Sequence, residues 1–381
     1  MIYLDNAATT FPKAPGTLER AVELYRELGV SPGRGNHDLA MRASDAVEEV
    51  RAKVATFFGA PDPTRVAFAA NASDALNTVL LGLVRPGDHV VATRLDHNSV
   101  LRPLHHLAET GVIAWDAAPF DNAGIVTADA IEALLRPNTR LVVMAHASNV
   151  IGTVQPVAEI ARRCAARGVP VVVDAAQSAG QVPIDMAAMG IGALAFTGHK
   201  SLYGPSGIGG LVLMPSLDVE TSRFGGTGMD SASLVHTRSY PLRLEAGTLN
   251  LLGVLGLGLG LDFVSLEGVE AIHAREAALL RRLRDGLVSI DGVTVYLASG
   301  GLSDRVAVLA CNVAGVHPQD VGAILDGDFE IAVRVGVHCA PLAHRDLGTI
   351  DRGAVRFSLG AFTAAADIDA AIAAMRAIAT G

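Results

Sequence analysis

The chain has 381 residues, of which 50% are hydrophobic and 18% are charged. This composition can bury a large core and excludes an intrinsically disordered chain. The formal net charge is -9 and no run rich in Lys and Arg occurs, so we expect neither nucleic acid nor an acidic membrane surface as a partner. The three cysteines, Cys164, Cys311 and Cys339, are too scattered for a disulfide framework, and their odd number fits a reducing compartment.

No segment has the composition of a signal peptide or of a membrane span. Residues 1–6 lack both a basic region and an apolar region. The most apolar stretch, 249–261, is too short to span a bilayer and is interrupted by four glycines. We predict that it forms a buried, closely packed helix, and that the protein is soluble and cytoplasmic.

The first 250 residues alternate between amphipathic helices and short apolar strands. Continuous apolar strands that are separated by helices indicate an α/β domain, with a parallel sheet covered on both faces. Ligands bind such sheets at the carboxyl ends of the strands, so polar residues there are the candidate site. The predicted helices cover residues 17–28, 44–58, 73–83, 96–108, 128–135 (capped by Thr127) and 156–168, and the predicted strands cover 65–69, 89–92, 112–117, 141–145, 171–173, 194–197 and 209–213.

After about residue 250 the pattern changes, which predicts a second, smaller α+β domain. We therefore expect a large domain of residues 1–250 and a small domain of residues 251–381. The sequence leaves open whether the N-terminal segment packs against the small domain. The predicted elements are a helical region at 247–290, strands at 293–296, 305–312, 331–335 and 354–359, a helix at 318–325, and a final helix capped by Thr363.

Two side chains that follow apolar strands are candidates for cofactor chemistry. Lys200 ends the segment Thr197-Gly198-His199-Lys200, and a lysine held at a strand end can form a Schiff base with a carbonyl cofactor. Taken alone, this segment is more simply interpreted as a loop with a surface lysine. Asp174 follows the strand 171–173, where a buried carboxylate needs a fixed partner such as a pyridinium nitrogen. A helix cap or a structural ion pair is the alternative for Asp174.

Other common site motifs are missing from the sequence. None of the Gly-x-Gly segments has the third glycine of a dinucleotide-binding fingerprint in register. The sequence also contains no Walker A loop, no His-Glu-x-x-His motif and no paired Cys-x-x-Cys motif. We therefore expect no metal site.

Several separated segments together resemble the class V aminotransferase family, and within it the cysteine desulfurases of the SufS-like and selenocysteine-lyase-like group. The resemblance runs from residue 2 to about residue 375. It implies the type I fold of pyridoxal-phosphate-dependent transferases, with a mainly parallel seven-stranded sheet in the large domain and a smaller α+β C-terminal domain. The segments are Leu4-Asp5-Asn6-Ala7-Ala8-Thr9-Thr10, Asp174-Ala175-Ala176-Gln177, Thr197-Gly198-His199-Lys200, Glu245-Ala246-Gly247-Thr248 and Arg334-Val335-Gly336-Val337-His338-Cys339-Ala340.

The resemblance implies which residues hold the cofactor, pyridoxal 5'-phosphate. Lys200 bonds to it, Asp174 pairs with its ring nitrogen, and Gln177 faces its ring hydroxyl. His97 stacks on the ring and assists proton transfer, although without the resemblance a plain histidine at a helix N-terminus is the simpler interpretation. Contacts to the phosphate are implied for Ser73, Thr197 and His199 and, from the partner subunit of a homodimer, for Thr248.

The resemblance also implies how an amino acid substrate is bound. Asn149, Arg356 and Arg334 look like the groups around the substrate carboxylate. Arginine suits this task because its planar fork binds a carboxylate through two hydrogen bonds. The alternative for Arg356 is a strand residue that faces solvent.

Cys339 is the implied nucleophile, which would hold sulfur as a persulfide. It lies between Gly336 and Pro341, in what the sequence suggests is a mobile loop. Arg334, and His338 when protonated, are expected to lower the pKa of its thiol. A buried structural thiol is the alternative. Cys164 and Cys311, in a predicted helix and a predicted strand, are expected to be inert packing residues.

The predicted function is that of a cysteine desulfurase that converts L-cysteine to L-alanine, with a sulfur-acceptor protein as a further partner. Other reactions on the same scaffold remain alternatives: selenocysteine lyase, cysteine sulfinate lyase or aminotransferase. A non-catalytic protein of sulfur relay or assembly is a further alternative. The chain departs from the family pattern after Cys339, where it continues as Ala340-Pro341-Leu342-Ala343-His344, and this leaves the sulfur acceptor and the substrate range open.

Overall fold

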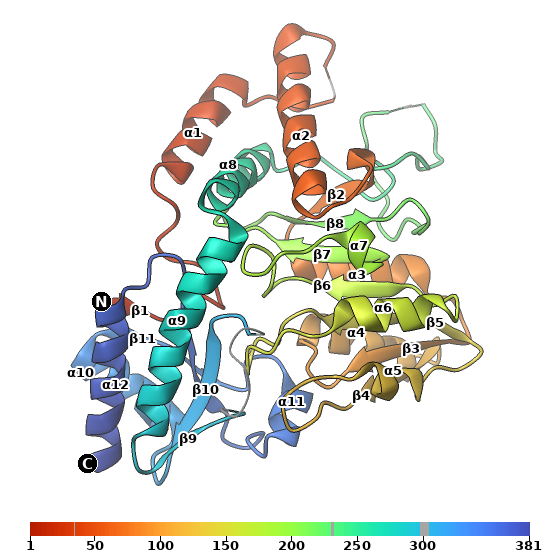
Figure 1. The fold of residues 1–381 in the computed structure, drawn as a ribbon. Coiled ribbons are helices and arrows are strands. Elements are labelled where there is room, and N and C mark those ends of the chain that lie inside the picture. The colour runs from red at the N-terminus through yellow and green to blue at the C-terminus, as the bar shows by residue number, and fades with distance from the viewer. Residues whose placement is uncertain (34, 230–231, 298–304) are drawn as a thin grey trace.

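The computed structural model describes residues 1–33, 35–229, 232–297 and 305–381. A large sheet with helices on both faces forms one part, and a smaller sheet with helices on one side forms the other (Figure 1). The helices are α1 (Thr17–Leu28), α2 (Asp38–Phe57), α3 (Ala72–Leu83), α4 (Asn98–Glu109), α5 (Ala128–Glu132), α6 (Val157–Ala165), α7 (Met186–Met189), α8 (Leu251–Glu267), α9 (Val269–Val288), α10 (Pro318–Phe329), α11 (Pro341–Asp346) and α12 (Ala365–Thr380). The strands are β1 (Ile2–Tyr3), β2 (Val66–Ala69), β3 (Asp88–Thr93), β4 (Ile113–Ala118), β5 (Thr139–Ala145), β6 (Val171–Asp174), β7 (Ala193–Thr197), β8 (Gly209–Leu213), β9 (Val293–Val295), β10 (Val308–Val313), β11 (Ile331–Ala332), β12 (Arg334–Gly336) and β13 (Ala354–Ser358).

The large sheet has seven strands in the order β2-β8-β7-β6-β5-β3-β4. Neighbouring strands from β7 to β4 are parallel, whereas β8 is antiparallel to both β7 and β2. The prediction of a mainly parallel seven-stranded sheet is thus confirmed. The exception has a local cause, since residues 198–208 return the chain directly from β7 to its neighbour β8.

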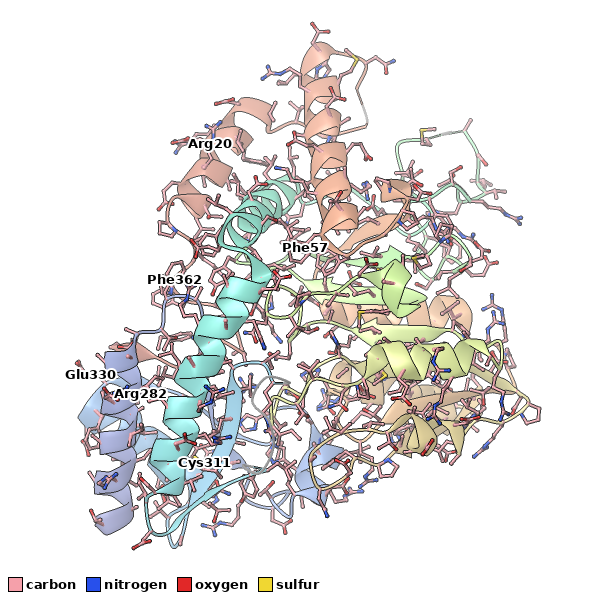
Figure 2. All side chains as sticks on the ribbon, viewed as in Figure 1. Arg20, Phe57, Arg282, Cys311, Glu330 and Phe362 are labelled. Atoms are coloured by element: carbon pink, nitrogen blue, oxygen red, sulfur yellow. The ribbon has the colours of Figure 1, made fainter. Side chains whose placement is uncertain are left out.

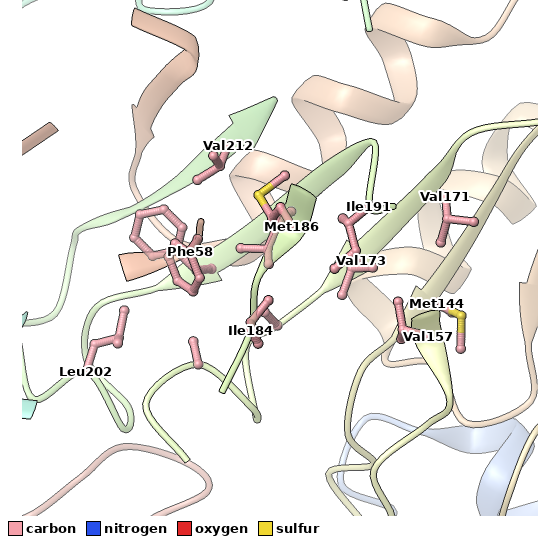
Figure 3. Close-up of a cluster of buried hydrophobic side chains, with 14 of the residues drawn as sticks. Phe58, Met144, Val157, Val171, Val173, Ile184, Met186, Ile191, Leu202 and Val212 are labelled. Carbon is pink, nitrogen blue, oxygen red and sulfur yellow. The ribbon is translucent and has the colours of Figure 1, made fainter. Parts of the chain in front are cut away.

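Alternate residues of the central strands fill two separate cores, one on each face of the sheet. On β6, Val171 and Val173 belong to the cluster that packs against α2, α6 and α8, and Val172 belongs to the cluster that packs against α3 and α4. Figure 3 shows the first cluster, where Val173 lies near Ile191 and Met186. Burial on both faces explains why these strands read as unbroken apolar runs.

The smaller sheet has the order β12-β13-β10-β9 and is packed against α9, α10 and α12. Arg282 on α9, labelled in Figure 2, forms a two-pronged ion pair with Asp369 on α12, with N–O distances of 2.5 and 2.7 Å. The N-terminal strand β1 pairs in parallel with β11, and Leu4 is buried in the core of this part. The N-terminal segment therefore packs with the C-terminal part.

The apolar stretch near residue 250 is the buried helix that the sequence predicts. Its glycines allow close approach: a Cβ on Gly260 would lie 2.2 Å from the carbonyl oxygen of Leu202. Within the described residues no single helix is long and apolar enough to cross a membrane, and α8 and α9 meet that test only as a pair bent by 75°. A domain division near residue 250 stays a proposal. In its favour, all seven strands of the large sheet precede residue 250. Against it, the apolar residues of α8, which follow residue 250, pack in the core of the large sheet.

Several predicted limits differ from the structure, and three of the differences have a clear local cause. The helix expected at 44–58 begins at Asp38, because His37 caps it by accepting a hydrogen bond from the Ala40 N–H. The strand expected at 331–335 is two strands, since β11 pairs with β1 while β12 pairs with β13. Thr363 does not cap the last helix; Ala364 precedes it, and the carboxylate of Asp367 accepts from the Ala364 N–H.

Gly260→Ala is expected to destabilise the protein strongly. The new methyl group would collide with main-chain atoms of residues 202–204, which cannot move aside as a flexible side chain could. Overpacking of this kind costs about 1–3 kcal/mol or more, which outweighs the gain of about 1 kcal/mol in helix propensity. The apparent melting temperature, followed by circular dichroism, measures the effect.

Gly327→Ala is the matched control, because Gly327 lies in α10 and a Cβ there meets no atom within 4 Å. This variant should melt at the same temperature as the parent chain or slightly above it. Equal melting temperatures for the two variants would contradict the close approach of α8 to residues 202–204.

Candidate active site

A cavity of about 340 Å3 lies at the carboxyl ends of the parallel strands of the large sheet. β6 ends at Asp174 and β7 ends at Thr197, and both residues line the cavity. The polar residues that follow these strands in the sequence therefore share one space. The other lining residues are Asn71, Ala72, Ser73, Leu95, His97, Ser99, Ala145, Ala147, Asn149, Ala176, Gln177, His199 and Lys200.

Lys200 enters the cavity from the connection between β7 and β8. Its carbonyl oxygen accepts hydrogen bonds from the Tyr203 N–H (2.8 Å) and from the Thr10 hydroxyl (3.0 Å), which fix the main chain there. Burial lowers the pKa of the Lys200 ammonium to about 8, and the carboxylate of Asp174 opposes this shift. A lysine with a pKa near 8 supplies the neutral amine that reacts with carbonyl carbons.

Asp174 is a carboxylate buried at the end of β6, with 6% of its surface exposed. Burial raises the pKa of Asp174, while a hydrogen bond from the Ala176 N–H (2.9 Å) and the charge of Lys200 lower it. A cationic ring nitrogen in the cavity would stabilise the ionised carboxylate. The donor chemistry of Asp174 and Lys200 thus fits pyridoxal phosphate.

His97 caps the N-terminus of α4, and its Nδ1 accepts a hydrogen bond from the Ser99 N–H (3.0 Å). Burial lowers the pKa of His97 to about 4, and the positive charges of Lys200, Arg334 and Arg356 lower it as well. The imidazole is therefore neutral at physiological pH. A neutral ring can lie against an aromatic cofactor and can accept a proton.

Three polar residues that line the cavity have side chains suited to binding a phosphate. Ser73 lies in the first turn of α3, where N–H groups without helical partners attract anions. The Ser73 hydroxyl is 2.5 Å from that of Ser99. The Thr197 hydroxyl is buried and has no hydrogen-bond partner among the described residues, and His199 lines the same space. An orphaned buried hydroxyl indicates a ligand, so these residues also fit pyridoxal phosphate.

Arg356 lies on β13 and is 1% exposed, so the alternative of a solvent-facing strand residue is wrong. Its guanidinium donates to the carbonyl oxygen of Asn149 (3.1 Å) and to the carboxylate of Asp5 (2.8 Å), while its Nε has no partner among the described residues. Arg334 lies directly opposite on β12. Two facing arginines favour an anionic ligand between them and the cavity.

Asp5 is a site residue that the sequence reasoning missed. It lies within the first segment quoted for the family resemblance, but the contact that gives it meaning spans 351 positions of the chain. Its carboxylate partly neutralises Arg356. Gln177 also contacts the N-terminal segment, since its amide donates to the carbonyl oxygen of Ala7 (3.0 Å).

Cys339 lies in a tight turn that leads into α11 at Pro341, rather than in a long loop. Both His338 and Cys339 have left-handed backbone conformations, with φ of 49° and 56°. The carbonyl oxygen of His338 accepts from the Asn149 side chain (2.6 Å), and that of Cys339 accepts from the Asn98 N–H (2.7 Å). The turn is thus bonded to Asn149, which lines the cavity, and to Asn98, which follows the lining residue His97.

The expected charge on His338 is wrong. Burial, together with the charge of Arg356, lowers the pKa of His338 to about 2, so the imidazole is neutral. It therefore cannot lower the pKa of Cys339 as a cation. His338 can therefore affect Cys339 only through its position in the turn.

Thr248 does not line the cavity of Lys200. It lies instead beside two other cavities, of about 280 and 240 Å3, which Glu245 also lines. Within one chain it therefore cannot contact a phosphate bound near Ser73 and Thr197, and its implied role depends on a second subunit. Cys164 and Cys311 are buried, and burial raises their pKa values to about 11 and about 12, as expected for packing residues. The described residues contain no cluster suited to a metal ion.

The sequence and the structure were compared with known proteins. A protein named "probable cysteine desulfurase" from Mycolicibacterium paratuberculosis is 37% identical over all of this chain, which spans 56% of that relative's length. A cysteine desulfurase from Dickeya dadantii is 37% identical over 91% of this chain and 84% of its own length.

The fold also matches the folds of solved protein structures. The cysteine desulfurase from Thermococcus onnurineus superimposes with a TM-score of 0.93 at 33% identity, over 100% of this chain and 95% of that one. The predicted type I fold of pyridoxal-phosphate-dependent transferases is thereby confirmed. The family model "Aminotransferase class-V" matches residues 2–371. The chain therefore belongs to the class V aminotransferase family.

Proposed function

We propose that the protein is a pyridoxal-phosphate-dependent cysteine desulfurase that converts L-cysteine to L-alanine and retains the sulfur on Cys339. One observation carries the proposal: the turn of Cys339 accepts a hydrogen bond from Asn149, which lines the cavity that Lys200 and Asp174 share. It also accepts one from the Asn98 N–H, next to the lining residue His97. Relatives and structural neighbours that are named cysteine desulfurases support it.

The cofactor would be held at both of its ends. Lys200 would bond to its carbonyl carbon, Asp174 would face the ring nitrogen, and Ser73 and Thr197 would bind the phosphate. When bound, the cofactor withdraws electrons from the α-carbon of the substrate. The residues of the chain must then bind the substrate, move protons and present a nucleophile.

Substrate binding would rest on the pair of arginines. The Nε of Arg356 has no partner among the described residues, and its fork is held by Asn149 and Asp5, so the side chain is oriented before the substrate carboxylate arrives. Arg334 adds a second positive charge from the neighbouring strand. This preorganisation reduces the entropy lost on binding.

Proton transfer would rest on groups that titrate readily or are already neutral. Lys200, with a pKa of about 8, can take a proton from the substrate α-carbon and return one. His97 is neutral and can accept a proton in the same cavity. Both groups avoid a permanently charged state that would make proton transfer slow.

The sulfur step would use Cys339 as the nucleophile. Its sulfur attacks the sulfur of bound L-cysteine, a sulfur–sulfur bond forms, and the carbon–sulfur bond of the substrate breaks. The thiol proton of Cys339 is balanced by the proton that the product gains at its β-carbon. L-Cysteine and the Cys339 thiol thus become L-alanine and a Cys339 persulfide. A sulfur-acceptor protein would then remove the sulfur.

We also propose that the protein acts as a homodimer in which Thr248 reaches the phosphate site of the partner. The position of Thr248 outside the cavity of its own chain supports this assembly. Glu245, which precedes it in the same segment, is held by a buried ion pair with Arg51 (2.8 Å) and by the Phe68 N–H (2.6 Å). This segment is therefore rigid enough to present Thr248 to another subunit.

Lys200→Ala should abolish the visible absorbance of the protein loaded with pyridoxal phosphate, because the covalent attachment is lost. Lys13→Ala is a demanding control, since burial also lowers the pKa of Lys13 to about 8. Lys13 donates to the carbonyl oxygen of His199 (2.6 Å) but does not line the cavity, so this variant should stay yellow. A colourless parent protein that takes up no added cofactor would overturn the proposal.

Arg356→Lys should raise the KM for L-cysteine by about tenfold or more, because the charge remains while the planar fork is lost. Cofactor absorbance should not change. Arg352→Lys, at a position whose side chain bonds only to the Val316 carbonyl among the described residues, should keep the parent KM. Steady-state kinetics of alanine formation measure both variants, and an unchanged KM for Arg356→Lys would remove Arg356 from the substrate site.

Cys339→Ala should stay yellow and lose alanine formation from L-cysteine by about a hundredfold or more, since the attacking sulfur is gone. It should retain activity towards L-cysteine sulfinate and L-selenocysteine, whose leaving groups need no thiol. Cys164→Ala, at a buried position of α6, should behave like the parent chain. Alanine release from L-cysteine at the parent rate by Cys339→Ala would favour a lyase without a persulfide.

A further inference from the structure

The turn that carries Cys339 has an unfavourable backbone conformation. Two consecutive residues other than glycine, His338 and Cys339, are left-handed. Such conformations persist only where surrounding groups hold them, and they gather at functional sites. The two main-chain hydrogen bonds from Asn98 and Asn149 fix carbonyl oxygens, but they leave the side chain of His338 to be held by other groups.

His338, His344 and Thr349 are joined by their side chains into a buried hydrogen-bond chain. Its Nδ1 lies 3.1 Å from Nε2 of His344, and Nδ1 of His344 lies 2.7 Å from the hydroxyl of Thr349. On its other side, Nε2 of His338 lies 3.4 Å from the carbonyl oxygen of Arg334. His344 and Thr349 are 0% and 5% exposed. The chain therefore runs through protein interior from the end of α11 to β12.

The positions of the hydrogens give this hydrogen-bond chain a single direction from donor to acceptor. A carbonyl oxygen can only accept, so Nε2 of His338 must carry the hydrogen that faces Arg334. Nδ1 of the neutral ring is then an acceptor, which requires a hydrogen on Nε2 of His344. Nδ1 of His344 is in turn an acceptor and takes the hydrogen of the Thr349 hydroxyl at 2.7 Å, a shorter contact than the 3.3 Å from that hydroxyl to the carbonyl oxygen of His344. The reverse arrangement would set the lone pair of His338 Nε2 against the carbonyl oxygen of Arg334.

Protonation does not interrupt the chain near neutral pH. Burial is the main cause that lowers the pKa of His338 to about 2 and that of His344 to about 4, and the charge of Arg356 lowers both. The residues at the Thr349 end of the hydrogen-bond chain are also held in place by other contacts. Thr349 N–H donates to the carbonyl oxygen of His344 (2.8 Å), and the Asp346 carboxylate of α11 binds Arg94 at the end of β3 through two hydrogen bonds of 2.5 Å.

We infer that Thr349 and His344 are positioning residues for Cys339: their one-directional hydrogen-bond chain locks the His338 ring and thereby holds the left-handed turn that presents the thiol. The inference rests on the proposed function, in which the Cys339 sulfur attacks the substrate. It assigns a role to His344, which ends the segment after Cys339 where the sequence departs from the family pattern. Neither residue lines the cavity of Lys200.

Thr349→Val tests the inference with almost no change in volume. The hydroxyl is lost, Nδ1 of His344 loses its donor, and the chain loses its direction. Thr349→Ser is the matched control that keeps the hydroxyl. Three measurements apply to both loaded variants: alanine formation from L-cysteine, turnover of L-cysteine sulfinate, and hydrogen–deuterium exchange of the peptide that contains Cys339.

Thr349→Val should lower kcat for L-cysteine by about tenfold and speed exchange of the Cys339 peptide by a similar factor, as expected when a buried hydrogen bond no longer holds a local structure. KM, cofactor absorbance and turnover of L-cysteine sulfinate should stay at parent values. Thr349→Ser should match the parent chain in all of these.

Parent values of L-cysteine turnover and Cys339 exchange in Thr349→Val would overturn the inference. Equal losses with both substrates, together with faster exchange throughout the chain, would also overturn it, because Thr349 would then serve general stability. If Thr349→Val fails to fold, His344→Gln and His344→Leu replace it: the amide can accept from Thr349 and donate to His338, so only the leucine variant should lose L-cysteine turnover. A parent protein with no L-cysteine activity would contradict the proposed function, and exchange of the Cys339 peptide would still decide whether the chain holds the turn.

Discussion

The buried carboxylate of Asp174 is the constraint on which the site depends. A charge at the end of a strand that is covered on both faces is expensive unless a cation lies close to it. Lys200 supplies positive charge from the next strand end, and the antiparallel return of β8 holds it there. A bound cationic ring would further stabilise the ionised carboxylate of Asp174. The same burial lowers the pKa of Lys200 and raises that of Asp174, so it favours the neutral amine of Lys200 while it makes the carboxylate of Asp174 dependent on a nearby cation.

A second charge pair connects distant parts of the chain to this centre. Arg356 from the small sheet binds Asp5 from the N-terminal segment and the carbonyl oxygen of Asn149 from the large part. The pairing of β1 with β11 brings Asp5 into place. A single guanidinium thus joins three segments, which explains why an N-terminal motif matters for a site built mainly at the strand ends of the large sheet.

The sequence predicts the parts of this structure that depend on local pattern. The apolar runs locate the seven strands of the large sheet, and β8 is predicted at its observed limits, because burial on both faces leaves a continuous signal. The strand ends then point to Asp174 and Lys200. The split of residues 331–335 into β11 and β12, the contact of Asp5 with Arg356, and the chain behind His338 could not be predicted, since each depends on pairing between distant segments or on a tautomer set by several neighbours.

Cys339 comes from the C-terminal part, whereas Lys200 and Asp174 belong to the large sheet. Under the proposed function, the distance between the Cys339 sulfur and a bound substrate would therefore depend on how the two parts meet. Hydrogen bonds from Asn98 and Asn149 to the Cys339 turn, and the ion pair of Arg94 with Asp346, cross this boundary beside the cavity. These contacts hold the turn from the large part, and the chain through His344 holds it from its own part. A strained turn held from both sides has little freedom. Under the proposed function, sulfur would therefore leave by the approach of an acceptor rather than by a movement of the turn that carries Cys339.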